Sequence, residues 1–217
     1  MAHVPIPHED ESLVAYLFGD RIALAETYAD LLVTEGIEWG LIGPRETDRV
    51  WDRHIVNSLC VSPLINKGLF VADLGSGAGL PGIVLAIARP DLYIDLVEPM
   101  ARRCDFLSLC VDRLGLGSTV NVVRCRVEEY EPSPDILTCR ALANMSSLVE
   151  MVDRFIPPAT LLAIKGTRAA AEVSDAHAVL SSHHLQADII HSHISVPYSD
   201  KPVELGTVVS VHARRKK

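Results

Sequence analysis

The sequence lacks the paired cysteines that build a disulfide framework or a zinc cluster. Its five cysteines are odd in number, scattered and without a C-x-x-C pair: Cys60, Cys104, Cys110, Cys125 and Cys139. We therefore expect reduced, buried thiols. None of the nine histidines belongs to an H-E-x-x-H motif or a Cys/His grouping, so we predict no metal site.

The sequence also lacks a membrane segment and an excess of positive charge. No apolar run approaches the roughly 18 residues that span a bilayer, and the N-terminus, MAHVPIPHEDES, is unlike a signal or transit peptide. We expect a cytoplasmic monomer with no membrane partner. The net charge of −8 argues against binding nucleic acid through bulk charge, although a local basic face stays possible.

The first part of the 217-residue chain is predicted to be helical. Apolar residues recur at helical spacing over 11–36, with an interruption at Gly19-Asp20, and a second helix follows Gly43-Pro44. From residue 69 onward the pattern changes to alternating strands and helices. We therefore expect a helical N-terminal extension, residues 1–68, packed on an α/β domain, residues 69–217.

The α/β domain is predicted to contain a mostly parallel sheet with helices on both faces. An antiparallel pair of strands, 186–196 and 206–215, ends the domain, because the nine residues between them are too few for a crossover helix. The other strands are expected at 69–75, 92–99, 120–130, 134–141 and 159–166, and the helices at 80–90, 100–117 and 145–153.

The first strand runs into a glycine-rich loop, and the stretch VADLGSGAGLPG (71–82) that contains this junction has four glycines. It matches G-x-G-x-x-G, and Glu98 lies about 20 residues beyond the middle glycine, as in a dinucleotide-binding fold. This pattern keeps an NAD(P)-dependent dehydrogenase open. Asp73, however, would repel a pyrophosphate and suits a cationic ligand such as an ammonium or sulfonium. Together with the terminal strand pair, Asp73 favours a class I S-adenosylmethionine-dependent methyltransferase fold, which is Rossmann-like.

Six segments, read in order, resemble the RsmG (GidB) family of 16S rRNA methyltransferases. The resemblance implies S-adenosylmethionine as cofactor, 16S rRNA of the small ribosomal subunit as partner, and methylation of guanosine N7. One departure is that Cys139-Arg140 is followed by Ala-Leu, where the family often has Phe. The segments are WDRHIVNSL (51–59), GSGAGLPGIVLAIARPDL (75–92), RRCDFL (102–107), RVEEY (126–130), CRALANMSSLVEM (139–151) and LLAIKG (161–166).

The resemblance implies cofactor-binding residues at the ends of the first four strands. The glycine loop would approach the methionine part, and an acid after the second strand would accept the ribose hydroxyls. Residues after the third strand would hold the adenine. The expected set is Asp73, near the ammonium, Gly75, Gly77 and Leu80 in the loop, Glu98 for the ribose, Val127 and Glu128 for the adenine, and Arg140.

Arg140 and Lys165 are the candidate catalytic residues, at the carboxyl edge of the sheet. Guanine N7 has a lone pair and no proton, so its methylation needs no general base. We therefore expect these cations to hold O6 or phosphates. The RNA-binding candidates are Arg45, Arg49, Arg53 and Asn57, which recur every four residues and would form one helical stripe, together with Lys165 and His54. For His54 two interpretations stay open, because its spacing suits the core, whereas the resemblance places it in a family segment.

Three alternatives stay open on the sequence. The chain could be a methyltransferase for a small molecule, an NAD(P)-dependent dehydrogenase, or a ligand-sensing RNA-binding module without turnover. Binding of a nicotinamide cofactor would identify the second, and RNA binding without methyl transfer would identify the third.

Overall fold

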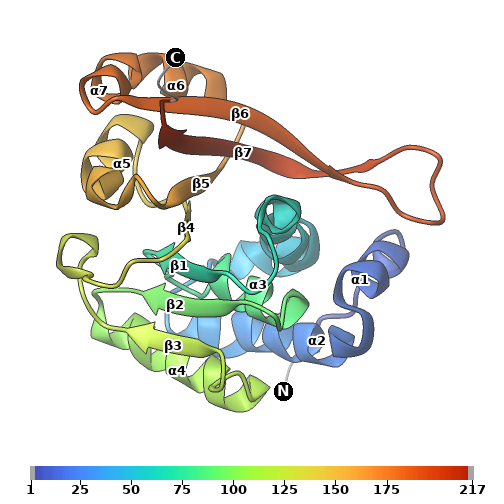
Figure 1. Ribbon diagram of the computed structural model, residues 1–217. Helices are drawn as coiled ribbons and strands as arrows, with labels where there is room; N and C mark the ends of the chain where they lie inside the picture. The colour runs from blue at the N-terminus through green and yellow to red at the C-terminus, as the bar shows by residue number, and fades with distance from the viewer. Residues whose placement is uncertain (1–2, 215–217) are drawn as a thin grey trace.

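A computed structural model describes residues 3–214 and has a seven-stranded sheet at its centre (Figure 1). The strand order is β3-β2-β1-β4-β5-β7-β6. Strands β1 to β5 run parallel, whereas β7 is antiparallel to both β5 and β6. The strands are β1 (Phe70–Leu74), β2 (Tyr93–Val97), β3 (Val120–Val123), β4 (Ile136–Arg140), β5 (Thr160–Lys165), β6 (Leu185–Ile194) and β7 (Val203–Ala213). This architecture confirms the predicted fold class.

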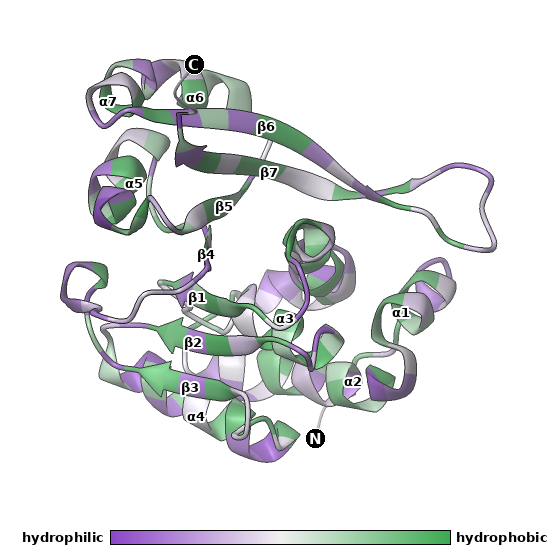
Figure 2. Ribbon diagram, viewed as in Figure 1, coloured by the Kyte–Doolittle hydropathy of each residue, from purple (hydrophilic) through white to green (hydrophobic). Residues whose placement is uncertain are grey.

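The two faces of the sheet bury two separate hydrophobic clusters. Successive residues of a strand point to opposite faces, so in β5 Leu162 and Ile164 join one cluster, whereas Leu161 and Ala163 join the other. Figure 2 shows β1 and β2 mostly in the hydrophobic colour, as expected for strands that are covered on both faces. The edge strand β6 alternates between the two colours.

The helices divide between these faces. Buried side chains of α3 (Gly82–Ala88) and α4 (Ala101–Leu114) belong to the first cluster. Those of α5 (Met145–Val152), α6 (Ala169–Asp175) and α7 (His177–Ser182) belong to the second. In the sequence, the short 3₁₀ turn η6 (Val127–Glu129) follows β3, and the turn η7 (Asp153–Phe155) precedes β5. No helix within residues 3–214 is long and apolar enough to cross a membrane.

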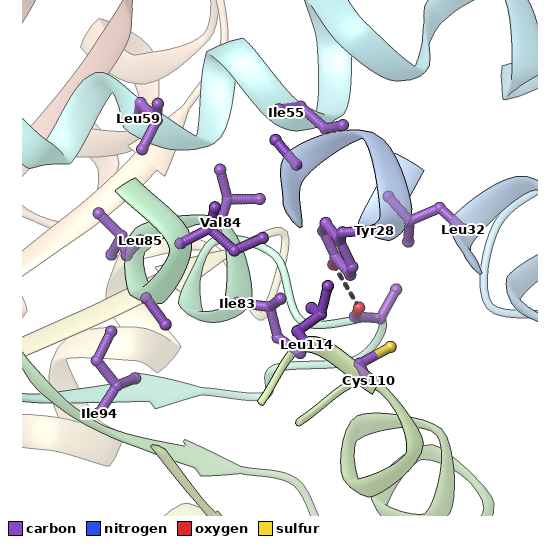
Figure 3. Close-up of a cluster of buried hydrophobic side chains, with 14 of the residues drawn as sticks. Tyr28, Leu32, Ile55, Leu59, Ile83, Val84, Leu85, Ile94, Cys110 and Leu114 are labelled. Atoms are coloured by element: carbon purple, nitrogen blue, oxygen red, sulfur yellow. Dashed lines mark hydrogen bonds between the residues drawn. The ribbon is translucent and has the colours of Figure 1, made fainter. Parts of the chain in front are cut away.

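The N-terminal helices pack into the same cluster as α3 and α4. Tyr28, Ile55 and Leu59 are buried there beside Ile83 and Val84 of α3 (Figure 3). The helical segments are α1 (Glu11–Phe18), η1 (Gly19–Arg21), α2 (Ile22–Leu31), η2 (Leu32–Gly36), η3 (Pro44–Arg49), η4 (Val50–Val56) and η5 (Leu59–Leu64). The division into an extension, 1–68, and a domain, 69–217, stays a prediction.

Two local expectations from the sequence are wrong, and two helices were not predicted. The segment after Pro44 is a 3₁₀ helix followed by a π-helix, rather than one α-helix. The third strand ends at Val123, because the chain then turns into η6, where the Glu129 carboxylate accepts a hydrogen bond from the Arg126 N–H. Helices α6 and α7 were not predicted, because their sequence has no clear apolar period. The buried residues of this segment are Ala169 in α6, Leu180 in α7 and Ala176 between the two helices.

One hydrogen bond ties the N-terminal helices to the glycine loop. The hydroxyl of Tyr28, on α2, donates to the carbonyl of Ala78 at 2.7 Å, and the tyrosine is fully buried (Figure 3). The next residue, Gly79, has φ of 95°, and a Cβ there would lie 3.0 Å from the Tyr28 hydroxyl. The tyrosine therefore packs directly against the loop and fixes one of its carbonyls.

Tyr28→Phe is expected to lower the free energy of unfolding by about 1–3 kcal/mol, because it leaves the Ala78 carbonyl without its buried donor. Urea denaturation would measure the loss. Tyr16→Phe is the matched control, since Tyr16 is 46% exposed. Equal stabilities for the two variants would contradict the importance of this bond.

Candidate functional site

The glycine loop lies at the carboxyl end of β1, the edge where open α/β sheets bind ligands. Gly75 has φ of 66°, and a Cβ there would lie 2.6 Å from the Leu142 side chain. Glycine is therefore required at this position for both its backbone conformation and the space. Leu142 follows β4, so the loop packs against the connection after the neighbouring strand.

Asp73 lies beneath the loop with its carboxylate fully buried. One oxygen, Oδ2, accepts a hydrogen bond from the Gly82 N–H, the first residue of α3, at 3.0 Å. The other oxygen, Oδ1, is buried without a hydrogen-bond partner in residues 3–214. Burial raises the pKa of this carboxyl group to about 7.

Glu98 follows β2, and its side chain also binds the backbone of the loop. Its Oε2 accepts from the Gly77 N–H at 3.0 Å, and its Oε1 accepts from the Met100 N–H at 3.1 Å. The side chain is buried, with Arg103 Nη1 3.6 Å from Oε2. Because a carboxylate oxygen has two lone pairs, each oxygen can still accept one more hydrogen bond.

The remaining residues of the expected cofactor set lie along the same edge. Leu80 is half-buried at the end of the loop. Val127 is buried in η6, and its carbonyl accepts from Arg154 Nη2 at 2.9 Å. Glu128 is exposed beside it. The adenine-binding role of Val127 and Glu128 stays a prediction.

A cleft of about 840 Å³ opens at the carboxyl ends of β4 and β5. The segment Arg49–Asn57 lines one side and α6 the other. Cations outnumber acids among its charged lining residues, although the whole chain is acidic. The cations are Arg49, Arg53, Arg140, Lys165 and Arg168, and the acids are Asp52, Glu172 and Asp175. The local basic face that the sequence left open therefore lies in this cleft.

Arg140, the last residue of β4, is half-buried and lines the cleft. Its Nη1 is buried without a hydrogen-bond partner in the described chain. Burial, followed by the nearby Arg53, lowers the pKa of Arg140. Since a buried cation normally has a partner, the unpaired Nη1 marks a place for an anionic ligand group.

Lys165 lies at the cleft but makes two hydrogen bonds within the protein. Its Nζ donates to Glu172 Oε2 and to the Ala143 carbonyl, both at 2.8 Å. The lysine side chain is only 8% exposed. The phosphate- or O6-binding role expected for Lys165 would require breaking this pair, and separating a buried pair costs about 3–5 kcal/mol.

The expected stripe of RNA-binding residues is only partly formed. Arg49, Arg53 and Asn57 line the cleft, but Arg45 does not. Residues four apart share a face of an α-helix, whereas the chain from Pro44 to Arg49 is a 3₁₀ helix with about 3.0 residues per turn. The Asn57 amide also donates to the Leu205 carbonyl at 3.2 Å, so it braces β7.

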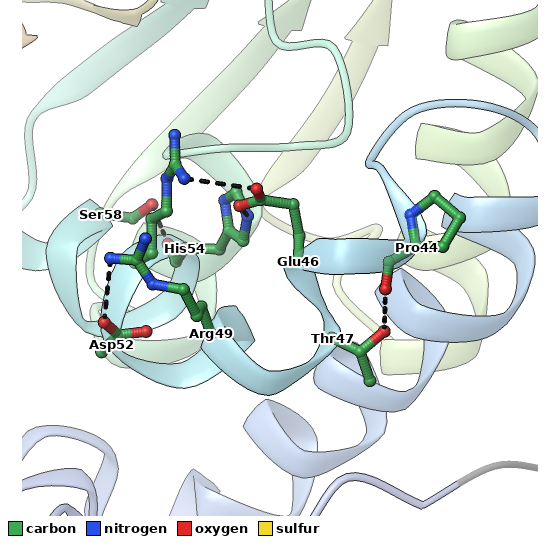
Figure 4. A network of polar contacts seen from close by, with 8 residues as sticks. Pro44, Glu46, Thr47, Arg49, Asp52, His54 and Ser58 are labelled. Carbon is green, nitrogen blue, oxygen red and sulfur yellow. Dashed lines mark hydrogen bonds and ion pairs between the residues drawn. The ribbon is translucent and has the colours of Figure 1, made fainter.

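The imidazole of His54 is buried, and its RNA-binding role stays a prediction. Its Nε2 lies 2.9 Å from Glu46 Oε2, and Glu46 also pairs with Arg53 at 3.3 Å (Figure 4). Burial, followed by the charge of Arg140, lowers the pKa of His54. His54 is therefore a core residue beside the cleft.

A metal centre was not expected, and the structure brings no such ligand set together within residues 3–214. The five cysteines are all free, and four are buried. Burial raises the pKa of Cys60 and of Cys139 to about 12, so both are unreactive thiols.

Comparison with known proteins decides the family. The family model described as GidB, rRNA small subunit methyltransferase G, matches residues 21–196. The chain belongs to this family. A "Ribosomal RNA small subunit methyltransferase G" of Mycobacterium sp. (strain JLS) is 46% identical over 187 residues, 83% of this chain and 80% of the relative. One of Salinispora tropica is 47% identical over 183 residues, 80% and 76% of the two chains.

Solved structures agree on the fold of this GidB chain. The B. subtilis M1A22 tRNA methyltransferase TrmK superposes with a TM-score of 0.55 at 14% identity, over 73% of this chain and 65% of that one. An S-adenosylmethionine-dependent O-methyltransferase of Thermotoga maritima gives 0.54 at 14% identity, over 75% and 66%. Membership of this family confirms S-adenosylmethionine as the cofactor. It also identifies the chain as a methyltransferase and not a dehydrogenase.

Three residues of the site in this GidB chain were missed in the sequence. Leu142 covers Gly75, and Met100, 53% exposed, presents an apolar side chain two residues after Glu98. Glu172 pairs with Lys165 in the cleft. A signal existed for Met100, an apolar residue directly after the strand-end acid and a proline. No signal existed for Glu172, whose helix was not predicted.

Asp73→Asn is expected to stabilise the protein increasingly as the pH rises. The folded-state pKa of Asp73 lies above its unfolded value of 3.8, so the wild type loses stability between pH 4 and about pH 7 and then levels off. The free energy of unfolding of the variant, relative to wild type, should grow across this window by up to roughly 4 kcal/mol.

Asp91→Asn is the control of opposite sign, because the hydrogen bond from Arg89 lowers the pKa of Asp91 to about 2. The ionised Asp91 carboxylate stabilises the fold above pH 4. Asp91→Asn should therefore be less stable than wild type throughout that pH range. Urea titrations from pH 4 to pH 8 would test both. A pH-independent difference for Asp73→Asn would contradict a buried, titrating Asp73.

Proposed function

We propose that this chain transfers the methyl group of S-adenosylmethionine to N7 of a guanosine in the 16S rRNA of the small ribosomal subunit. The names of the relatives support small-subunit rRNA as the substrate, and a cytoplasmic location is part of the same proposal. The observation that carries the proposal is a pair of buried atoms without partners, the Asp73 Oδ1 acceptor and the Arg140 Nη1 donor.

These two atoms suit the amino-acid end of S-adenosylmethionine, which carries an ammonium and a carboxylate. Asp73 would accept from the ammonium, and Arg140 would donate to the carboxylate. Both charged groups come from neighbouring parallel strands, since Asp73 of β1 pairs with Thr138 of β4 and Arg140 follows Thr138 by two residues. Gly75 and Gly77 have no side chain to obstruct the ligand between these groups.

The nucleoside end would lie along β2 and η6. Each Glu98 oxygen has a lone pair left for one ribose hydroxyl, since its other bond is to a backbone N–H. The exposed Met100 would pack against the adenine, with Val127 and Glu128 at its edge. Leu80, at the end of the glycine loop, would close over the ligand.

The bound cofactor supplies an electrophilic methyl group on a sulfonium. Guanine N7 attacks with a lone pair and carries no proton, so no side chain has to act as a base. The residues therefore act by aligning the two reactants. A cation at N7 would oppose the positive charge that forms on the base, which is why we assign Arg140 to the cofactor carboxylate.

The exposed arginines of the cleft would contact the RNA backbone. Arg49 and Arg53 are about half-exposed, and Arg168 is exposed at the start of α6. A few phosphate contacts on an otherwise acidic protein give weak binding to RNA in general. Shape recognition of the ribosomal particle would then supply the specificity.

Methyl transfer to ribosomal particles tests this function. Radiolabelled S-adenosylmethionine, wild-type protein and small subunits lacking the modification are expected to give label that maps to guanine N7 of 16S rRNA. Large subunits and free rRNA serve as parallel acceptors. Cofactor binding without label in any fraction would overturn the rRNA proposal and favour a small-molecule acceptor or a binding module without turnover.

Arg140→Met separates cofactor binding from stability. The methionine keeps the apolar stem but removes the unpaired guanidinium, so the ligand-free variant should be no less stable than wild type. The dissociation constant for S-adenosylmethionine should rise at least about tenfold, because a charge-assisted hydrogen bond is lost. Calorimetry would measure both.

Arg168→Met is the matched control, since this exposed arginine lines the same cleft. It should bind S-adenosylmethionine like wild type. Wild-type cofactor affinity in Arg140→Met would show that Arg140 does not hold the cofactor.

A further inference from the structure

The ion pair of Lys165 and Glu172 is built into the wall of the cleft. The two side chains are 8% and 21% exposed, and the Nζ to Oε2 distance is 2.8 Å. Lys165 also donates to the Ala143 carbonyl, so it links the end of β5, the connection after β4, and α6. The lysine therefore fixes the position of the glutamate rather than presenting its own charge.

The glutamate keeps lone pairs on both oxygens for a ligand, since each carboxylate oxygen can accept two hydrogen bonds. Lys165 binds Oε2, whereas Oε1 has no hydrogen bond to any residue in 3–214. Glu172 lines the cleft, and its carboxylate is partly exposed there. A carboxylate repels phosphate and accepts only from a donor. The ligand group that faces Glu172 must therefore carry N–H or O–H.

Among RNA groups, the ribose 2′-hydroxyls and the edges of the bases offer such donors, and only the base edges offer two donors side by side. A base extruded from a stack is read by hydrogen bonds to its Watson–Crick edge. Guanine presents two adjacent donors there, N1–H and the N2 amino group, which match the two oxygens of one carboxylate. Adenine presents an acceptor, N1, at the corresponding position, and uracil presents one donor between two carbonyl groups.

We propose that Glu172 binds the Watson–Crick edge of the target guanine, accepting from N1–H and the N2 amino group, with Lys165 as its positioning residue. This inference rests on the proposed function. N7 lies on the opposite, Hoogsteen edge of guanine, beside O6. A carboxylate on the Watson–Crick edge therefore leaves N7 unobstructed. The contact would also explain why a cleft for an anionic substrate retains a carboxylate.

Inosine tests this contact, because it keeps N1–H, O6 and N7 of guanosine and lacks only the N2 amino group. Wild-type protein first locates the methylated guanosine. Small subunits are then reconstituted with 16S rRNA that carries guanosine or inosine at that position. For wild type, kcat/KM should be about tenfold lower with inosine, the expected effect of losing a hydrogen bond to a charged group.

Glu172→Gln should remove this discrimination. The amide oxygen can still accept from Lys165, so the fold is kept. On guanosine subunits kcat/KM should fall about tenfold, and the guanosine-to-inosine ratio should approach one. A merely structural role of Glu172 would lower both rates by the same factor and leave the ratio unchanged.

Glu150→Gln is the matched control. Glu150 lies on α5, outside the lining of the cleft, exposed and without an ion pair in residues 3–214. Its variant should keep both the rate and the ratio, and all three proteins should bind S-adenosylmethionine equally by calorimetry. A wild-type ratio near one, or an unchanged ratio in Glu172→Gln, overturns the proposed contact. Absence of N7 methylation by wild type instead overturns the proposed function.

Discussion

The hydrogen bond from the Gly82 N–H to the buried Asp73 carboxylate determines where α3 begins, and therefore the path of the glycine loop before it. Gly82 has to be glycine, because a Cβ would lie 2.7 Å from Asp73 Oδ2 and 2.3 Å from Leu96. With this end fixed, Glu98 holds the middle of the loop through Gly77, and Tyr28 holds it through Ala78. Asp73 and two residues from other parts of the chain thus impose one loop conformation, and the sheet supplies the edge on which it lies.

The cleft beside this loop shows how an acidic chain can gather positive charge in one place. Its net charge of −8 describes the whole surface, whereas five cations gather around one cavity. They do not act alike. Lys165 is occupied by Glu172 and Ala143, Arg140 is half-buried with an unpaired Nη1, and Arg49, Arg53 and Arg168 face solvent. The patch therefore consists of one paired lysine, one half-buried arginine and three exposed arginines, a division that a count of charges does not reveal.

The sequence was informative where one residue type meets one local requirement. Apolar runs ending in Asp73 and Glu98 marked buried parallel strands, and the glycines marked the turn between strand and helix. It was uninformative where the structure depends on distant partners. His54 is buried because Glu46 and the core surround it, and the stripe starting at Arg45 failed because the helix there is 3₁₀. Helices α6 and α7 rest on small side chains, so Glu172, which α6 positions, had no periodic signal.

The unpaired atoms Asp73 Oδ1 and Arg140 Nη1 link stability to binding. A buried polar atom without a partner costs about 1–3 kcal/mol, and more for a charged group, so the ligand-free fold is less stable than these packed side chains would allow. A ligand that supplies one cation and one anion removes both penalties at once, and the recovered free energy appears as affinity. A neutral donor or acceptor would satisfy either atom less strongly than a charged group. The same two atoms would therefore favour a zwitterionic amino-acid group over a pyrophosphate, which Asp73 repels, although the loop itself fits either.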